Sequence, residues 1–252
     1  MIIIGEKSMK RQFSYTVCLA SYNGATYIKS QIESIERQFS EKDELIVSDD
    51  GSSDNTLEVV SELNDEYHNI TIVNGPHMGY SCNFGNAAKY AKNDIILFSD
   101  QDDIWEENKI DEIDKYFSED AELTTVLHSM STFRNDELTD TNEIAIGYNR
   151  GVTRNLFRSS YWGCCMAVKR NFLFKFIPFR DYSVGHDVLI GLMTEKYGKC
   201  KFLDKKLIYH RLHGSNTSGK RTVKQMIDFR RELIKDYKAA KKLFTRNKEV
   251  TV

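Results

Sequence analysis

Three carboxylates fall within four positions of the chain, in the stretch Asp100-Gln101-Asp102-Asp103, directly after the apolar run 94–98. Like charges this close repel one another unless a positive group lies among them. Alternate residues of an extended segment point to the same side, so we expect Asp100 and Asp102 to face one pocket. Two carboxylates at a strand end suit Mg²⁺ or Mn²⁺, whose other ligands are commonly substrate phosphate oxygens. A solvated acidic loop, with Asp103 capping the next helix, is the alternative interpretation.

A second acidic pair, Asp49 and Asp50, follows the apolar run 44–48 and begins the segment Asp-Asp-Gly-Ser-Ser-Asp. A carboxylate at this position can accept hydrogen bonds from a ribose or from a base edge. The segment also suits a turn followed by a helix that Asp54 caps, and we expect both functions here. No Gly-x-Gly-x-x-Gly follows the first apolar run, 15–20, which disfavours a dinucleotide cofactor.

Two further groups, His186-Asp187 and the histidines His210 and His213, lie at the ends of apolar segments. A carboxylate at a helix N-terminus is stabilised as the anion, which is the state that a general base needs. An N-cap without chemistry is the alternative for Asp187. A neutral imidazole can complete a metal site. Because a spacing of three puts His210 and His213 on opposite sides of a strand, we expect only one of them to reach a given site.

The elements that carry these residues alternate between strand and helix patterns from residue 15 onward. The expected strands are 15–20, 44–48, 70–73 and 94–98, and the expected helices are 24–39, 54–67, 81–92 and 106–117. This alternation implies parallel βαβ units in a doubly wound sheet with helices on both faces. Ligands of such sheets bind beyond the carboxyl ends of the strands. The polar segments that follow the four strands should therefore gather on one rim.

The second half of the chain is less regular. We expect strands over 124–128, 163–168 and 207–212, and helices over 187–197 and 223–244.

Composition and charge limit the classes of function. The 252 residues suit one large domain with small additions, and a formal net charge of −2 gives no case for nucleic-acid binding. The five cysteines follow no zinc-binding spacing, which favours reduced thiols and a cytoplasmic protein. No apolar run approaches the roughly 18–20 residues of a membrane span, and the apolar start is too short for a signal peptide.

Several of these segments together resemble glycosyltransferase family 2. They are Ser21-Tyr22-Asn23-Gly24, Ser48-Asp49-Asp50-Gly51-Ser52 and the stretch FSDQDDIW at 98–105. The resemblance continues in order through Gly163, His186-Asp187 and His213, and so covers residues 14–220. The form SDQDDIW is similar to a bacterial subgroup, often rhamnosyltransferases, that builds O-antigen, capsule or cell-wall glycans.

This resemblance implies a GT-A fold: an α/β architecture with a Rossmann-like, mostly parallel sheet flanked by helices. It also implies a nucleotide-sugar donor, such as a dTDP- or UDP-sugar, a divalent cation and inversion at the anomeric carbon. The chain then divides into an N-terminal extension (1–13), the glycosyltransferase domain (14–220) and a C-terminal helix (221–252). Within the domain, 14–120 is the nucleotide-binding half and 121–220 the acceptor half.

Roles carried over by position from the resemblance fall into four groups. The donor-binding side chains are Ser21, Tyr22, Asn23, Asp50, Asn83, Asp100 and Gln101. Asp102 is the main metal ligand, His213 completes metal or diphosphate binding, and Asp187 is the catalytic base. The acceptor contacts are Trp162, Gly163, Cys164 and His186. The catalytic pair is often Glu-Asp in this superfamily, so His186 departs from the pattern and its role is open.

Two other classes of function compete with this one. A sugar-phosphate nucleotidyltransferase also uses an α/β sheet, aspartates and Mg²⁺, but it usually carries an early glycine- and arginine-rich triphosphate loop, and residues 15–30 contain none. A non-catalytic domain that binds a nucleotide sugar is the other alternative, and the presence of Asp102 and Asp187 argues against it.

The C-terminal segment is strongly basic in a chain that is nearly neutral. Between Lys220 and Glu249 there are eleven basic and four acidic residues, with apolar residues between them. A basic amphipathic helix can lie on an anionic membrane, which would suit a lipid-linked acceptor and a place on the inner face of the plasma membrane. Packing on its own domain, or on a second subunit in a homodimer, is the alternative.

Overall fold

The structure, a computed structural model, describes residues 11–134, 137–144, 147–180, 185–213 and 222–248. Most of the predicted N-terminal extension (1–13) and the domain boundary predicted at 220 lie outside these residues.

The first half of the chain forms parallel βαβ units, as the sequence predicts. Strands β3, β2, β1 and β4 are adjacent in that order, and each neighbouring pair is parallel. The elements in chain order are β1 (Tyr15–Ser21), α1 (Ile28–Glu36), β2 (Glu44–Asp49), α2 (Thr56–Tyr67), β3 (Ile70–Asn74), α3 (Tyr80–Lys89), β4 (Ile95–Asp100) and α4 (Lys109–Glu119). The carboxyl ends of these strands meet at one edge of the sheet.

The second half extends the same sheet with mixed strand directions. Strand β8 is antiparallel to β4 and to β6, while β9 is parallel to β6 and antiparallel to β5. In the described part of the chain nine strands form the sheet, the later ones being β5 (Ile104–Trp105), β6 (Thr125–Arg134), β7 (Glu137–Ile144), β8 (Met166–Lys169) and β9 (Cys200–Arg211). The later helices are α5 (Val152–Phe157), α6 (Arg170–Leu173), α7 (His186–Tyr197) and α8 (Val223–Lys248).

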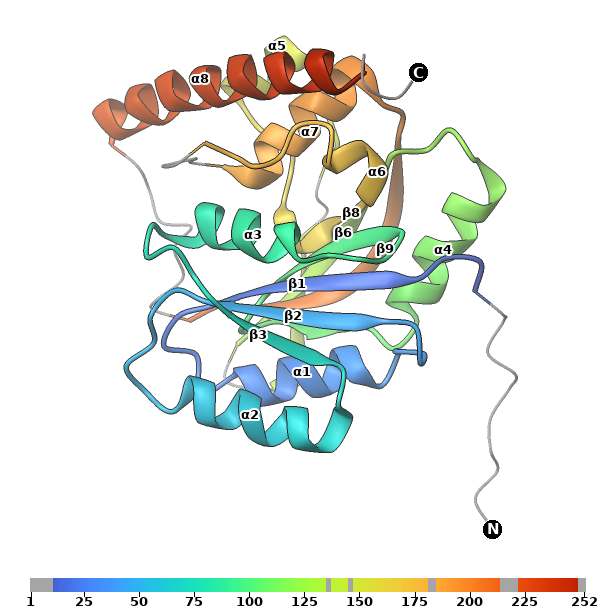
Figure 1. Ribbon diagram of the computed structural model, residues 1–252, viewed down its shortest axis with the longest axis vertical. Coiled ribbons are helices and arrows are strands. Elements are labelled where there is room, and N and C mark those ends of the chain that lie inside the picture. Colours follow the sequence, from blue (N-terminus) through green and yellow to red (C-terminus); the bar gives the residue numbers. More distant parts are fainter. Residues whose placement is uncertain (1–10, 135–136, 145–146, 181–184, 214–221, 249–252) are drawn as a thin grey trace.

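Helices cover both faces of the sheet (Figure 1), with α1 and α2 below it and α3, α7 and α8 above it. The core consists of two hydrophobic clusters, and successive side chains of β1 alternate between them. Val17 and Leu19 belong to one cluster, and Cys18 belongs to the other. Strands buried on both faces are typical of parallel sheets in α/β proteins. The fold class is therefore the predicted one.

Several predicted details are wrong. Residues 163–168 are not one strand, because Gly163–Cys165 form a 3-10 helix before β8 begins at Met166. Asp54 is not an N-cap, since α2 begins at Thr56 after Asn55; its carboxylate accepts the Thr56 backbone N–H at 3.1 Å in a local turn. The helix cap that the alternative interpretation gave to Asp103 is also absent, because α4 begins at Lys109 and follows Asn108.

Candidate active site

A cavity of about 1000 Å³ lies beyond the carboxyl ends of β1 and β4. Its size is that of a small-molecule site. The loops after β1, β2 and β4 line one part. The start of α3, α5, the 159–164 segment, the start of α7, His210, His213 and the first turns of α8 also line it. Every predicted site residue lines it: Ser21, Tyr22, Asn23, Asp50, Asn83, Asp100, Gln101, Asp102, Trp162, Gly163, Cys164, His186, Asp187 and His213.

Both histidines of the 210–213 segment reach the acidic cluster, which consists of Asp100, Asp102 and Asp103. The expectation that only one histidine would do so is wrong. His210 Nδ1 lies 2.7 Å from Asp103 Oδ1, and His213 Nε2 lies 2.6 Å from Asp102 Oδ2. The alternation rule holds only within a strand, and β9 ends at Arg211, before His213. The cluster therefore contains two carboxylate–imidazole pairs around Asp100.

The cluster holds more negative charge than its own side chains neutralise. Burial, followed by the negative charges of Asp103 and Asp102, raises the pKa of Asp100 to about 8. Burial, followed by Asp103, also raises the pKa of Asp102. Burial disfavours the charged form of His210, but the hydrogen bond and charge of Asp103 outweigh it and raise this pKa to about 9. A cation among these groups would relieve the repulsion.

The side chains of this cluster fit a divalent cation. Ligand atoms of Asp100, Asp103, Cys164 and His210 all lie within 4.8 Å of one another. Asp103 is 1% exposed, and its Oδ2 has no hydrogen-bond partner among the described residues. A buried carboxylate oxygen without a partner is costly unless another group satisfies it. This set differs from the prediction, because neither of the predicted metal ligands, Asp102 and His213, belongs to it, although they are hydrogen-bonded to each other beside it.

The loop after β1 is held in place by amide side chains. Gln101 Nε2 donates to Tyr22 O at 3.0 Å, and Gln101 Oε1 accepts from Tyr22 N at 2.9 Å. The same amide leaves no room for a side chain at Gly24. Asn23 Oδ1 accepts from Ser53 N at 2.8 Å, which joins this loop to the loop after β2. Gln101 and Asn23 thus fix the shape of the rim, whereas the Tyr22 ring is exposed.

Asp50 and Asn83 connect the neighbouring strand ends. The Asp50 carboxylate accepts the backbone N–H groups of His77 at 2.7 Å and Gly79 at 2.8 Å, and so holds the loop before α3. Asn83 Nδ2 donates to Ser48 O at 2.7 Å. Both side chains still face the cavity, and Asn83 Oδ1 has no hydrogen-bond partner among the described residues.

The start of α7 brings His186 and Asp187 to the lining of the same cavity. Asp187 lies in the first turn and accepts the Val188 N–H at 2.8 Å. His186 is 3% exposed and packs against Phe84 at 4.3 Å between ring centroids. Neither ring nitrogen of His186 has a partner among the described residues, and burial lowers its pKa to about 3. The imidazole is therefore neutral at ordinary pH. A Cβ at position 163 would lie 2.5 Å from its Nε2, which explains the glycine there.

Lys109, which no sequence motif identifies, lies behind the cavity wall and contacts its residue Cys164. It is fully buried, its Nζ donates to Cys164 O at 2.9 Å, and it lies 3.8 Å above the centre of the Trp105 ring. Burial lowers its pKa to about 8. Lysine is common on helix surfaces, so the sequence of α4 does not indicate that Lys109 is buried. Its burial follows from the packing of α4 against the 164–165 segment.

A cavity at the carboxyl edge of a mostly parallel sheet, with an acidic cluster at the end of β4, is the arrangement of GT-A glycosyltransferases. "Glycosyl transferase family 2" matches residues 16–183, which is most of the chain. The protein therefore belongs to glycosyltransferase family 2.

Individual relatives agree with this assignment. The chain is 25% identical to an uncharacterized glycosyltransferase of Nostoc sp. over 211 residues, which are 80% of this chain and 65% of that protein. It is 29% identical to the UDP-Glc:alpha-D-GlcNAc-diphosphoundecaprenol beta-1,3-glucosyltransferase of Escherichia coli, over 69% of each chain. The chain spans 65%, 23% and 21% of three longer curated relatives.

The fold is also that of solved enzymes. S. aureus TarS 1-349 in complex with UDP-GlcNAc has a TM-score of 0.71 at 17% identity, covering 92% of this chain and 70% of that one.

Two other predictions can be compared with the structure. All five cysteines are free thiols. Among the described residues, no helix combines the length and apolar character needed to cross a membrane.

Proposed function

We propose that the protein transfers a sugar from a UDP- or dTDP-sugar to a hydroxyl group of a cell-surface glycan or lipid-linked saccharide, with inversion and with Mn²⁺ or Mg²⁺. One observation carries the proposal: Asp100 and Asp102 of the acidic cluster line the same cavity as Asp187. Relatives named for transfer from UDP-glucose and for dTDP-rhamnosyl transfer support the donor class. A solved relative that holds GDP-mannose and Mn²⁺ supports the cation.

The donor would bind on the rim formed by the half 14–120. Asp50 and the residues after β1 would contact the base and ribose, and the cluster of Asp100, Asp102, Asp103 and the histidines would hold the cation. A bound cation would neutralise the donor diphosphate and assist its departure.

Asp187 would act as the general base. Its position in the first turn of α7 stabilises the carboxylate form, because the helix N-terminus carries partial positive charge. The carboxylate can accept the proton of an acceptor hydroxyl as that oxygen attacks the anomeric carbon on the face opposite the leaving diphosphate. Inversion needs a single displacement and hence a single base.

His186 would orient a sugar hydroxyl beside this base. As a neutral imidazole it can donate from one ring nitrogen and accept at the other. An unpaired buried polar group costs about 1–3 kcal/mol, which a substrate hydroxyl would recover. Trp162, Gly163 and Cys164 line the adjoining wall, so the acceptor would enter from the 121–220 half.

The test is Asp187→Asn, with Asp204→Asn on the exposed side of β9 as the matched control. The Asp187 variant should bind donor with unchanged Kd and turn over roughly 10²- to 10⁴-fold more slowly, the usual contribution of a general base. The control should match the wild type in both measurements. Turnover of the Asp187 variant at the wild-type rate would remove the base assignment. Retention of anomeric configuration, read by NMR of the product, would remove the single displacement.

A further inference from the structure

Helix α8 presents apolar side chains on two faces. Its inner face enters the core, where Leu233, Ala240 and Phe244 are buried. On its outer face Val223, Ile227 and Ile234 are 67%, 48% and 41% exposed. Spacings of four and seven residues place these three on one stripe of the helix. The stripe leaves apolar surface in water.

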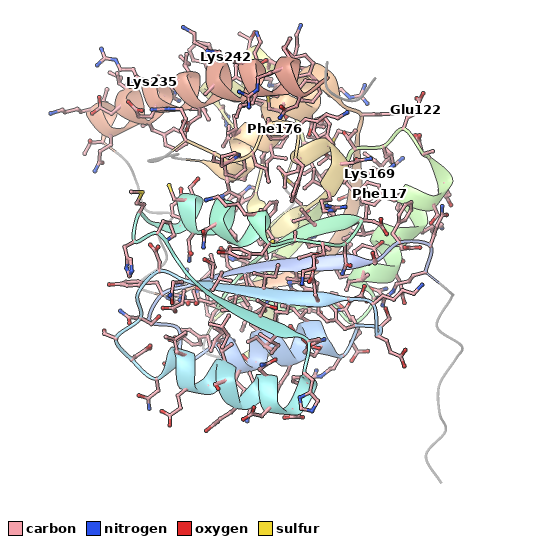
Figure 2. All side chains as sticks on the ribbon, viewed as in Figure 1. Phe117, Glu122, Lys169, Phe176, Lys235 and Lys242 are labelled. Atoms are coloured by element: carbon pink, nitrogen blue, oxygen red, sulfur yellow. The ribbon has the colours of Figure 1, made fainter. Side chains whose placement is uncertain are left out.

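The stripe lies within a field of positive charge. Residues 223–248 carry nine basic and three acidic side chains, in a chain whose formal net charge is −2. The exposed basic residues are Lys224, Arg231, Lys235, Lys238, Lys242 and Arg246. Within the described parts of the chain, Lys224, Lys238, Lys242 and Arg246 form no ion pair. Figure 2 shows Lys235 and Lys242 on α8, with Phe176 on the inner side of the helix.

Helix α8 already packs against its own domain through its inner face, so the outer stripe is not needed for that contact. Arg180 Nη1 contacts Asp236 Oδ1 at 2.6 Å, and Asp236 is 1% exposed. The Phe244 ring stacks on Tyr197 with 4.3 Å between centroids. A second copy of the chain is a poor occupant, because a symmetric contact would set two basic faces against each other.

The outer stripe lies next to the apolar end of the active-site cavity. That end is lined by Leu156 and Phe157 of α5 and by Met226, Phe229 and Leu233 of α8. Phe157 is 68% exposed, and the Arg230 guanidinium donates to its carbonyl oxygen, which joins α5 to α8. Figure 1 shows the two helices together at one end of the molecule. The cavity is thus lined by Asp100 and Asp102 of the acidic cluster and, at this apolar end, by side chains next to the outer stripe.

We propose that the outer face of α8 docks on an anionic phospholipid bilayer, with Val223, Ile227, Ile234 and Phe157 at the boundary between headgroups and acyl chains. Basic side chains around an apolar stripe are the pattern of helices that lie in this interface. Docking brings this apolar end of the cavity to the bilayer, so the enzyme can reach an acceptor that is anchored there by an apolar chain. This last step rests on the proposed transferase function, whereas the docking does not.

Sedimentation of the full chain with vesicles tests the docking. We expect binding to phosphatidylcholine vesicles that contain about 30% phosphatidylglycerol, and much weaker binding to phosphatidylcholine alone. The test variant replaces three unpaired lysines of the outer face: Lys224→Ser, Lys238→Ser and Lys242→Ser. The control variant removes the same charge from exposed lysines elsewhere: Lys42→Ser, Lys89→Ser and Lys92→Ser. Each basic residue at an anionic surface changes partitioning roughly five-fold, so the test variant should bind about a hundred-fold more weakly.

A second variant, Ile227→Ser with Ile234→Ser, keeps the charge and should also lose vesicle binding. Equal losses in the test and control variants, or equal binding to neutral and anionic vesicles, would overturn the proposal. The proposal would also be overturned if the wild type did not bind vesicles but formed dimers, and if the double variant Ile227→Ser with Ile234→Ser were a monomer. Donor binding, measured without vesicles, should be unchanged in every variant. Vesicle binding by a wild type that binds no nucleotide sugar would refute the transferase while leaving the docking intact.

Discussion

Replacing Asp100 by asparagine removes one of three crowded carboxylates and tests the electrostatics of the site. Its pKa is raised from 3.8 to about 8 by burial and by Asp103 and Asp102. Without a cation, the folded protein therefore keeps a proton at pH 7 that the unfolded chain has released. Stability from this group is full below pH 4 and is lost as pH rises to about 8. At about 1.4 kcal/mol per pH unit, the loss is at most roughly 6 kcal/mol.

Asp100→Asn should therefore flatten the pH dependence of stability. In EDTA the wild type should lose a few kcal/mol more than the variant between pH 5 and pH 9, and the variant should be the more stable protein at pH 9. With Mn²⁺ the order at pH 9 should reverse, because the cation stabilises the wild-type cluster more strongly. Urea unfolding followed by tryptophan fluorescence measures these differences. Asp65→Asn, an exposed carboxylate on α2, is the control and should behave as the wild type. Parallel pH curves for the Asp100 variant and the wild type would refute the argument.

Two further substitutions test the packing around the cavity. Gly163→Ala should cost about 1–3 kcal/mol, since its Cβ would lie 2.5 Å from His186 Nε2, and should slow acceptor-dependent turnover more than donor binding. Gly147→Ala, with open space around it, should be neutral in both assays, and equal effects of the two would contradict the contact. Lys109→Met removes a buried amine whose pKa is lowered from 10.5 to about 8, so the wild type should gain roughly 3 kcal/mol relative to the variant between pH 8 and 10.5. A constant difference in unfolding free energy over that range would show that Lys109 titrates normally.

The rim of the site follows directly from the order of residues in the first half of the chain. Four apolar runs each end in a polar segment, and parallel βαβ units must bring those ends together. Asp50 and Asp100 therefore share a cavity although fifty positions separate them. Local pattern is sufficient here because each unit repeats the same period and connection.

The second half was harder to predict because its geometry depends on contacts between distant segments. Cys164 and Cys165 belong to a 3-10 turn beneath the cluster, where an apolar sequence alone suggests a strand. His213 reaches Asp102 because β9 ends two residues earlier, and the sequence does not mark that end. The burial of Lys109 depends on how α4 packs against the 164–165 segment, which no periodicity along α4 encodes.

The central claim is that the acidic cluster binds a nucleotide sugar through a divalent cation. Thermal unfolding of the protein with UDP-, dTDP- and GDP-sugars, each with Mn²⁺ or with EDTA, tests it most directly. A ligand at 100 times its Kd adds about 2.7 kcal/mol to stability, which is a measurable rise in Tm. We predict such a rise for a UDP- or dTDP-sugar in Mn²⁺, its loss in EDTA and its loss in Asp102→Asn. A rise of equal size in EDTA, or no rise with any nucleotide sugar in Mn²⁺, would contradict the claim.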